Sequence, residues 1–314
     1  METILIFGGF GFLGSNVIDY ALQNHLNDYK FIVFDIYEQH PSGKSFKNVA
    51  KIYKGDFTNR EDINIVFKEN KIDYVFHFIS TTVPANSNNN IRYDIESNLI
   101  STINMLDTCK SYPIKSIFFI SSGGAVYGDS TQYIHKESDN LNPNSSYGII
   151  KLTIEKYLKL YNHLYNLNYL CLRLANPYGA FHLSQKQGLI NIAIKKAISK
   201  QEFEVWGDGS NVKDYIYAED VARIIFTLVK RKIVNQVLNV GTNKGYAVNE
   251  ILGIIKKLVP SFTIKYKEQK SFDVPKVVLN TEAIVDYIDF ELTSLEQGIN
   301  KTFTWTKRQK NKPL

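Results

Sequence analysis

A glycine-rich turn between an apolar segment and a helical segment constrains the fold of this chain more than any other feature. Glycines at 8, 11 and 14 follow the apolar run Thr3–Phe7, and a helical pattern continues from them to about Gln23. Gly8 permits a tight turn, Gly11 permits a close approach of the backbone to a ligand, and Gly14 lets a helix pack against a sheet. A structural turn can use glycines in the same way, so the neighbouring residues decide between the two interpretations.

The residues around this turn favour a dinucleotide site. The N–H groups of Phe12 and Leu13 begin the helix, where the positive end of the helix dipole attracts a diphosphate. Asp35 ends the next apolar run about twenty residues later, where a carboxylate can accept hydrogen bonds from ribose hydroxyls. A carboxylate also repels a 2′-phosphate, and no Arg follows closely to attract one. The sequence therefore predicts NAD rather than NADP.

Apolar runs alternate with helical patterns through the first half of the chain. Runs that are apolar at nearly every position indicate strands buried on both faces, as in a parallel sheet covered by helices. The later runs are Phe31–Phe34, Tyr74–Phe78, Ser116–Ile120 and Tyr169–Leu174. A helical pattern over about Asp94–Cys109 separates two of them. The fold class predicted is α/β, a doubly wound parallel sheet of the Rossmann type.

The pattern changes after residue 175, which predicts a second and smaller lobe. Residues 1–175 are expected to form the NAD-binding domain, with later segments near 212–245 returning to it. Residues 176–314 are expected to form mainly a mixed α/β substrate-binding lobe, with helical patterns at Gln187–Lys200, Ala218–Lys230 and Val248–Leu258.

Composition excludes several classes of protein. The 314 residues carry a formal net charge of +6, too mild to indicate nucleic-acid binding but suited to an anionic small substrate. No apolar run approaches the roughly 20 residues that a membrane span requires, and the N-terminus does not have the pattern of a secretory signal. Two cysteines, Cys109 and Cys171, are too few for a disulfide scaffold or a thiolate metal site. We expect a cytoplasmic protein without a metal.

Tyr147 and Lys151 are four residues apart, which places both side chains on one face of a helix. A phenol with a pKa near 10 is a poor base at neutral pH and needs a nearby cation to stabilise its phenolate. Lys151 can supply that charge and can also hold ribose hydroxyls of the cofactor. A solvated helix face is the alternative, but the dinucleotide turn makes a catalytic pair the better interpretation.

With these motifs the sequence resembles the extended short-chain dehydrogenase/reductase family, in its NAD-dependent nucleotide-sugar epimerase/dehydratase branch. The resemblance covers nearly the whole chain. Its further motifs are the segments at 55–57, 77–80, 121–128, 173–179, 206–215 and 272–275. It implies a nucleotide-sugar substrate and a homodimer paired through helices around Asn98–Cys109 and Ser146–Tyr165.

The resemblance also implies roles for individual residues. Those implied for the cofactor are Gly8, Gly11, Phe12, Leu13, Gly14, Asp35, Asp56, Phe57, Phe78, Ile79, Ser80, Asn98, Tyr147 and Lys151. Those implied for the substrate are Thr82, Ser122, Tyr147, Asn176, Lys213, Lys270 and Val277. Lys213 and Lys270 stand where the family usually has arginines. The diphosphate would therefore be bound by ammonium groups, which act as point charges, rather than by planar guanidinium groups, which donate two hydrogen bonds at once. For Lys270 an ordinary surface lysine remains the alternative.

One departure concerns the third catalytic group. The family has a Ser or Thr four residues before the Tyr of its Val-Tyr-Gly motif, and that position here is Gly123. Ser122 lies one residue earlier and is our choice for the missing hydroxyl; Thr82 or a water molecule is the alternative.

The resemblance leaves several reactions open. A 4,6-dehydratase of the family carries an Asp-Glu pair where this chain has Gly124 and Ala125, which makes dehydration the weaker choice. A UDP-hexose 4-epimerase needs no such pair, and the mid-sized Val277 would admit an N-acetyl sugar. A 4-ketoreductase of deoxysugar synthesis is the alternative enzyme, and a non-catalytic dinucleotide-binding regulator is the alternative from another class.

Overall fold

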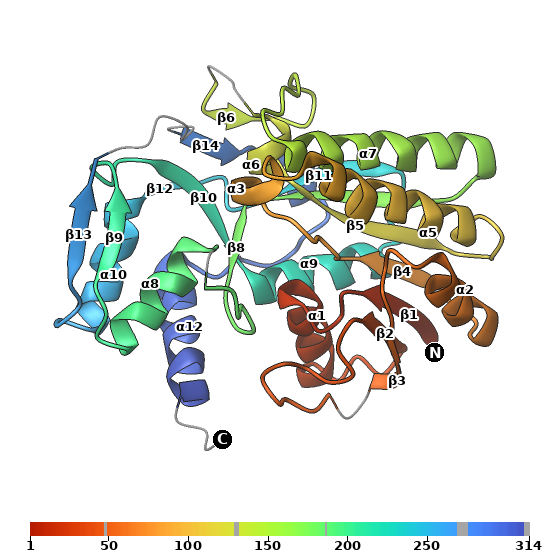
Figure 1. Cartoon of the computed structure of the whole chain (residues 1–314), viewed down its shortest axis with the longest axis horizontal. Coiled ribbons are helices and arrows are strands. Elements are labelled where there is room, and N and C mark those ends of the chain that lie inside the picture. Colours follow the sequence, from red (N-terminus) through yellow and green to blue (C-terminus); the bar gives the residue numbers. More distant parts are fainter. Residues whose placement is uncertain (47–48, 129–131, 186, 269–275, 311–314) are drawn as a thin grey trace.

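The computed structural model describes residues 1–46, 49–128, 132–185, 187–268 and 276–310. Its largest element is a parallel sheet of seven strands in the order β11-β7-β5-β4-β1-β2-β3 (Figure 1). The strands are β1 (Glu2–Phe7), β2 (Tyr29–Asp35), β3 (Val49–Lys54), β4 (Tyr74–His77), β5 (Ser116–Ser122), β7 (Tyr169–Leu174) and β11 (Gln236–Val240). The chain crosses from β3 back over β1 to β4, so the strand order reverses between β1 and β4. This confirms the doubly wound α/β fold, whose ligands bind at the carboxyl ends of the strands at that reversal.

Helices cover both faces of the large sheet (Figure 1). One face packs on α1 (Phe12–Gln23) and α9 (Ala218–Lys230). The other packs on α2 (Arg60–Glu69), α5 (Ser101–Cys109) and α7 (Ser146–Tyr165). Two hydrophobic cores result, and the strands contribute alternate side chains to each. This double burial explains why the strand sequences are apolar at nearly every position.

The helix expected over Asp94–Cys109 is longer and less regular than its sequence pattern indicates. It begins with α4 (Ile91–Asp94), continues as a π-helix over Ile95–Ile100, and ends as α5. Within it the Ser101 hydroxyl donates to the carbonyl of Glu96 (3.0 Å) and the Thr102 hydroxyl to that of Asn98 (2.6 Å). Hydroxyl groups that bond to backbone carbonyls in this way commonly accompany local irregularities of a helix.

A smaller sheet joins the second half of the chain to a segment of the first. Its hydrogen-bonded order is β12-β10-β14-β6, with β8 also paired to β10. The strands are β6 (Ile134–His135), β8 (Asn176–Tyr178), β10 (Val212–Tyr217), β12 (Gly245–Ala247) and β14 (Lys276–Leu279). β6 lies within the residue range expected for the first domain, but it pairs with β14 of the small sheet. In the range 212–245, α9 and β11 return to the large sheet, but β10 belongs to the small one.

The rest of the second lobe packs around a third core (Figure 1). It comprises α8 (Leu189–Ile198), α10 (Val248–Leu258), α12 (Leu295–Lys310) and the two-stranded sheet of β9 (Phe203–Trp206) and β13 (Ile264–Lys267). The short helices are α3 (Pro84–Ser87), α6 (Gly123–Val126) and α11 (Glu282–Val285). Across the described residues, none of the helices combines the length and the apolar character needed to traverse a bilayer.

Candidate active site

The glycine turn has the shape that a dinucleotide diphosphate requires. Gly8 has a φ of +79°, which strongly favours glycine. A Cβ atom at Gly14 would lie 2.5 Å from the carbonyl oxygen of Gly8, so α1 begins tightly against the turn. Gly11 is the N-cap residue of α1 and has no side chain that could accept from the first N–H groups of the helix. The backbone there is well suited to receive an anion.

Asp35 lies beside this turn, at the end of β2. One oxygen of its carboxylate accepts from the N–H of Phe10 (3.0 Å) and the other from that of Tyr37 (3.2 Å). Burial raises the pKa of Asp35, and these backbone donors oppose the effect. A Cβ at Gly8 would lie 3.0 Å from the Ile79 side chain, so the residues after β4 adjoin the turn. NAD thus fits the residues present at the carboxyl ends of β1, β2 and β4.

Three other residues expected at the cofactor differ in how accessible their side chains are. Asp56 is exposed and accepts from the N–H and hydroxyl of Thr58 (both 2.8 Å). The Phe57 ring is buried, 5.3 Å from Phe7 and 5.0 Å from His77 between ring centroids, so it belongs to the core. Asn98 is also buried, and its side-chain oxygen accepts from the N–H of Thr81 (3.0 Å).

Tyr147, Ser122 and Lys151 meet where β5 and α7 lie side by side. The Ser122 side chain is hydrogen-bonded to the Tyr147 phenol. The Lys151 ammonium donates to the carbonyl of Ile120 (2.9 Å) and lies 5.5 Å from the centre of the Tyr147 ring. The phenol is therefore hydrogen-bonded to Ser122, while the Lys151 ammonium is hydrogen-bonded to the backbone of β5 beside it.

Burial opposes ionisation of both groups. It raises the pKa of Tyr147 to about 12, and the hydrogen bond with Ser122 works in the opposite direction. It lowers the pKa of Lys151 to about 8, and the carboxylates of Asp94 and Glu155 oppose that change. Tyr147, with a raised pKa, and Lys151, with a lowered pKa, therefore lie close together. Neighbouring groups with shifted pKa values are common at sites of proton transfer.

The small sheet brings two expected substrate residues toward this pair. Lys213 in β10 pairs with Val277 in β14. Since side chains alternate along a strand, Leu279 shares the face of Val277, and Leu279 lies against Gly123, next to Ser122. The face that carries Lys213 and Val277 is therefore directed toward α6 and the catalytic residues.

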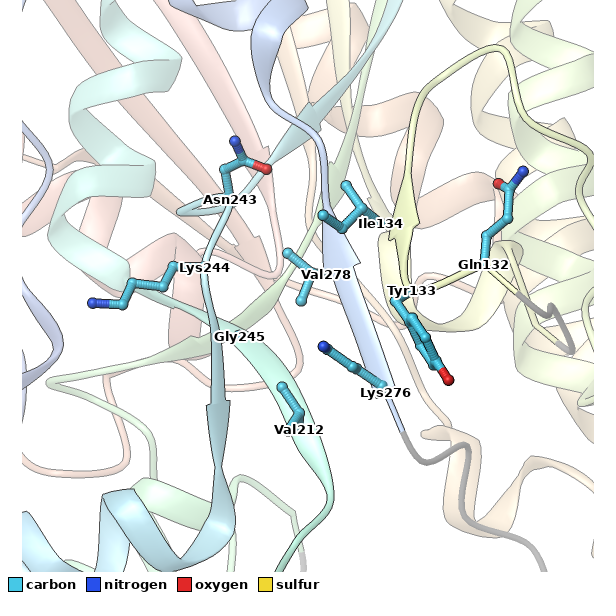
Figure 2. A pocket seen from close by; sticks show the side chains of 9 residues that line it. All are labelled: Gln132, Tyr133, Ile134, Val212, Asn243, Lys244, Gly245, Lys276 and Val278. Carbon is cyan, nitrogen blue, oxygen red and sulfur yellow. The ribbon is translucent and has the colours of Figure 1, made fainter.

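The opposite face of the same sheet carries an open pocket of about 660 Å³ (Figure 2). It is lined by Gln132, Tyr133, Ile134, Val212, Asn243, Lys244, Gly245, Lys276 and Val278. Because Val212, Lys276 and Val278 alternate with Lys213, Val277 and Leu279, this pocket is separated from the catalytic pair by the sheet itself.

The remaining expected substrate residues occupy three different environments. Asn176 is exposed and donates to the carbonyl of Asp214 (2.9 Å), which fixes its amide at the start of β8. Thr82 is buried and donates to a carboxylate oxygen of Asp94 (2.5 Å). Lys270 and the Asp-Val-Pro segment at 273–275 lie outside the described residues.

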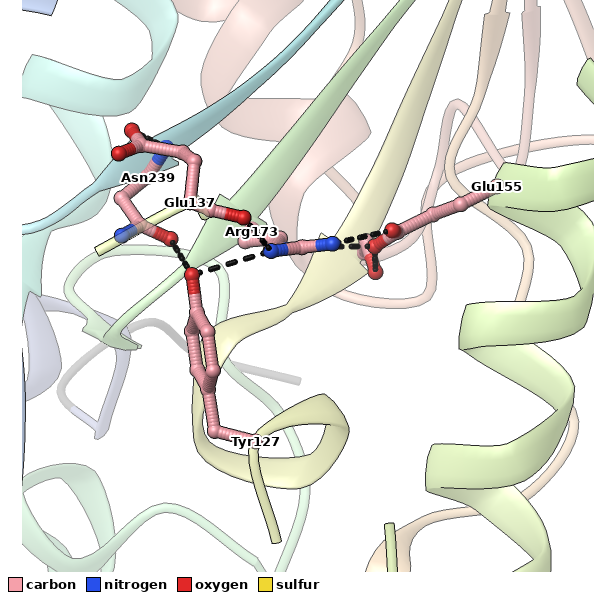
Figure 3. A network of polar contacts seen from close by, with 6 residues as sticks. Tyr127, Glu137, Glu155, Arg173 and Asn239 are labelled. Carbon is pink, nitrogen blue, oxygen red and sulfur yellow. Dashed lines mark hydrogen bonds and ion pairs between the residues drawn. The ribbon is translucent and has the colours of Figure 1, made fainter. Parts of the chain in front are cut away.

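A buried polar network supports the strand that carries Ser122 (Figure 3). Glu155 forms an ion pair with Arg173 (2.8 Å) and accepts from the Ser121 hydroxyl (2.5 Å). Arg173 also donates to Tyr127 (3.1 Å), whose hydroxyl donates to Asn239 (2.8 Å). Three consecutive residues of β5 thus contact three turns of α7: Ile120 contacts Lys151, Ser121 contacts Glu155, and Ser122 contacts Tyr147. This linkage fixes the positions of the Ser122, Tyr147 and Lys151 side chains relative to one another.

The sequence analysis missed Glu155 and Asp94. Glu155 is four residues after Lys151, so helical spacing alone placed it on the catalytic face. Asp94 is 1% exposed and influences both Tyr147 and Lys151. Its only sequence signal was a carboxylate at the edge of an apolar helical pattern, which usually marks a solvated position.

Together the fold and the site define an α/β enzyme that binds a dinucleotide at the carboxyl edge of its sheet. The model of the NAD dependent epimerase/dehydratase family matches residues 4–241, and the chain belongs to this family. The resemblance expected from the motifs is confirmed, and the enzyme uses NAD to act on sugar nucleotides.

The relatives that this chain resembles match it over nearly its whole length. A putative UDP-glucose 4-epimerase of Methanocaldococcus jannaschii is 32% identical over 97% of this chain and 98% of its own length. The structure of a UDP-glucose 4-epimerase of Thermotoga maritima with UDP-glucose has a TM-score of 0.91, with 29% identity over 99% of this chain and 100% of that one. A UDP-N-acetylglucosamine 4-epimerase of Methanobrevibacter ruminantium, in complex with UDP-N-acetylmuramic acid, has a TM-score of 0.89 and 25% identity over 98% and 99%.

Proposed function

We propose that this enzyme is a 4-epimerase of UDP-hexoses, and that it interconverts the glucose and galactose forms and the N-acetyl pair. The observation that carries the proposal is the hydrogen bond between Ser122 and Tyr147 beside the Lys151 ammonium, at the edge of the sheet where the dinucleotide turn lies. When bound, NAD supplies a reversible acceptor for the hydride of the sugar C4 carbon.

The chain's own residues would move the proton. Tyr147, as phenolate, takes the proton of the sugar C4 hydroxyl and later returns it, which makes it general base and then general acid. Ser122 donates a hydrogen bond to the same region and orients the reacting oxygen. Lys151 contributes positive charge, which favours the phenolate over the neutral phenol that burial alone would favour.

The site also has space where a dehydratase of the family would carry acidic side chains. A Cβ atom built at Gly124 meets nothing within 4 Å. An epimerase must let the keto sugar turn so that hydride returns to its other face, and this requires room rather than an additional acid. Open space at Gly124 and the small Ala125 support epimerisation over dehydration.

Substrate recognition would use both lobes. Lys213 and Asn176 would hold the diphosphate, with Lys270 as a further candidate, and Thr82 would lie on the sugar side. The mid-sized Val277 would leave room for a 2-acetamido group. If UDP-glucose is turned over and UDP-N-acetylglucosamine is not, the assignment of Val277 is wrong.

Exposed apolar side chains support the homodimer expected from the family. They gather on the helices named for that contact, at Ile95, Ile100, Ile149, Leu160, Leu164 and Tyr165, each more than a third exposed. Exposed apolar side chains concentrated on two helices are consistent with a protein interface, because such interfaces bury apolar surface. The cytoplasmic location expected from the sequence stays a prediction.

The decisive experiment compares Tyr147→Phe with Tyr157→Phe, a substitution on the same helix away from the Ser122 contact. The purified proteins are incubated with UDP-, GDP- and dTDP-sugars without added cofactor, and epimers are detected by NMR. We expect Tyr147→Phe to lose about 10³-fold in turnover and Tyr157→Phe to retain it. Normal turnover by Tyr147→Phe would overturn the proposal. Net oxidation of NADH or NADPH with a 4-keto sugar would identify a ketoreductase instead.

A further inference from the structure

Asp94 is a buried carboxylate within the candidate site that the proposed mechanism does not yet use. It ends α4, where the chain passes into the π-helix, and is 1% exposed. Its Oδ1 atom accepts from the hydroxyl of Thr82 (2.5 Å) and the amide of Asn98 (2.9 Å). Its Oδ2 atom is buried and finds no hydrogen-bond partner among the residues that the structure describes.

Such a group is expensive to bury. A carboxylate removed from water loses several kcal/mol of solvation unless a cation or several donors replace the water. Two donors reach one oxygen of Asp94, and the other oxygen remains unpaired. A buried polar atom of this kind requires an explanation, and π-helical turns such as the one that follows Asp94 are frequent at functional sites.

Lys151 is the nearby cation that can offset this cost through its charge and not through a hydrogen bond, since its ammonium donates to the carbonyl of Ile120. Burial lowers the pKa of Lys151, and Asp94 is the strongest of the charges that act in the opposite direction. The same carboxylate opposes ionisation of Tyr147. Asp94 therefore acts electrostatically on both members of the catalytic pair, and its hydrogen bonds reach a residue expected at the substrate and one expected at the cofactor.

We propose that Asp94 is a positioning residue of the reaction: its buried carboxylate holds the Thr82 hydroxyl and the Asn98 amide in place and presents a negative charge to the Tyr147–Lys151 pair. Its electrostatic role sets the pH range over which Tyr147 and Lys151 can work as a pair. This inference rests on the proposed function for its catalytic meaning, but its electrostatic part can be measured without a substrate.

Other ionisable groups near the pair must be considered in the same account. On the helix of Asp94 itself, Arg92 and Glu96 are exposed and bonded to each other (2.8 Å). The neighbours of Lys151 on the surrounding elements are Glu155 in α7, His77 in β4 and Cys171 in β7. The charge of Glu155 is already shared with Arg173 (2.8 Å). Asp94 is thus the nearby carboxylate without its own cationic hydrogen-bond partner in the described part of the chain.

The test is a direct titration of Lys151. Lysine Cε atoms are labelled with ¹³C and followed by NMR against pH, and the Lys151 signal is assigned by its loss in Lys151→Met. In Asp94→Asn, which keeps an oxygen acceptor but removes the charge, we expect the Lys151 midpoint to fall by about one pH unit. The control is Glu96→Gln, an exposed carboxylate two residues away, which should leave the midpoint unchanged. An unchanged midpoint in Asp94→Asn would overturn the proposal.

Activity provides the second readout. The pH–rate profile of Asp94→Asn should move toward lower pH on both limbs, because loss of a negative charge lowers the pKa of the phenol and of the ammonium alike. Thr82→Val removes a hydrogen bond but keeps the charge, so it should change the rate without moving the profile. If Asp94→Asn does not fold, Asp94→Ser gives the same comparison.

The two proposals fail in distinguishable ways. A shifted Lys151 midpoint without turnover of any UDP-hexose would leave Asp94 as proposed and reject the epimerase. Turnover with an unshifted midpoint would reject the role of Asp94 alone.

Discussion

A Cβ atom at Gly123 would lie 2.6 Å from the Cδ1 atom of Leu279. Position 123 is where the family resemblance leads us to expect a hydroxyl, and here the buried Leu279 side chain fills the space that such a residue would need. The hydroxyl of Ser122, one residue earlier, is the one that bonds Tyr147. The hydroxyl proposed for catalysis therefore lies one residue before the position that Leu279 packs against.

This relationship predicts unequal roles for two adjacent serines. Ser122→Ala should lower kcat by about 10²-fold, because it removes a hydrogen bond at the reacting oxygen. Ser121→Ala is the matched control, since the Ser121 hydroxyl bonds Glu155 instead (2.5 Å), and it should reduce kcat far less. Steady-state rates with UDP-glucose check this, and equal losses in the two variants would contradict it.

The packing of Leu279 also makes a prediction for Gly123. Gly123→Ser should lower stability without restoring the activity of Ser122→Ala, because Leu279 occupies the space.

The buried ion pair of Glu155 and Arg173 predicts a large loss of stability when it is broken. Both side chains are at most 5% exposed, so Glu155→Gln leaves the Arg173 charge uncompensated in the core. We expect the free energy of unfolding to fall by about 3–5 kcal/mol in chemical denaturation. Glu61→Gln breaks the exposed pair with Lys68 and should cause no measurable change. A small effect in Glu155→Gln would mean that water reaches the network of Figure 3.

Buried histidines predict that acid weakens the fold. Burial lowers the pKa of His40 to about 4, with the Lys44 charge acting in the same direction. Since the unfolded chain has the ordinary value near 6.5, it binds more protons between these two values, and stability falls as pH falls through that range. Between pH 7 and pH 5 the expected loss from His40 is about 2 kcal/mol. His40→Leu should show a correspondingly flatter pH dependence of unfolding, whereas substitution of the exposed His163 by Gln should match the unaltered protein.

Val277 predicts how the substrate range can be narrowed. A bulky side chain there would fill the space proposed for a 2-acetamido group, so Val277→Tyr should lower kcat/KM for UDP-N-acetylglucosamine at least about 10-fold relative to UDP-glucose. Lys276→Tyr places the same ring on the opposite face of β14 and should leave the ratio unchanged. A constant ratio in Val277→Tyr would place the acetamido group elsewhere.

Local patterns predicted the parts of the molecule that depend on one or two neighbouring elements. The glycine turn, Asp35 and the Tyr147–Lys151 spacing each lie within a single strand–helix unit, and the parallel strands were evident from their apolar runs. The pairing of β6 with β14 was not evident, because it joins residues more than 140 positions apart and leaves no periodicity in either segment. The place of β10 in the small sheet was likewise not evident, because the range 212–245 was expected to return to the first domain.

The electrostatics of the site were also beyond the reach of sequence patterns. Lys151 was expected to stabilise the phenolate as a nearby cation, but its hydrogen bond to the carbonyl of Ile120 could not be predicted from spacing. The importance of Asp94 depends on its burial, on its contact with Thr82 twelve residues away, and on an irregular helix, none of which spacing reveals.

The π-helical turn over Ile95–Ile100 has a consequence for how this segment can change in evolution. Such a turn holds one residue more than an α-turn, so loss of a single codon there would yield a regular helix. The helical turn α4 that precedes the deletion would then rotate by about 100° about the axis relative to α5, while Thr82 stays near the end of β4 in the sheet. Asp94 would move away from Thr82 although no side chain of the site had been mutated. The number of residues in this segment, as much as their identity, therefore determines whether the carboxylate of Asp94 lies close to Tyr147 and Lys151.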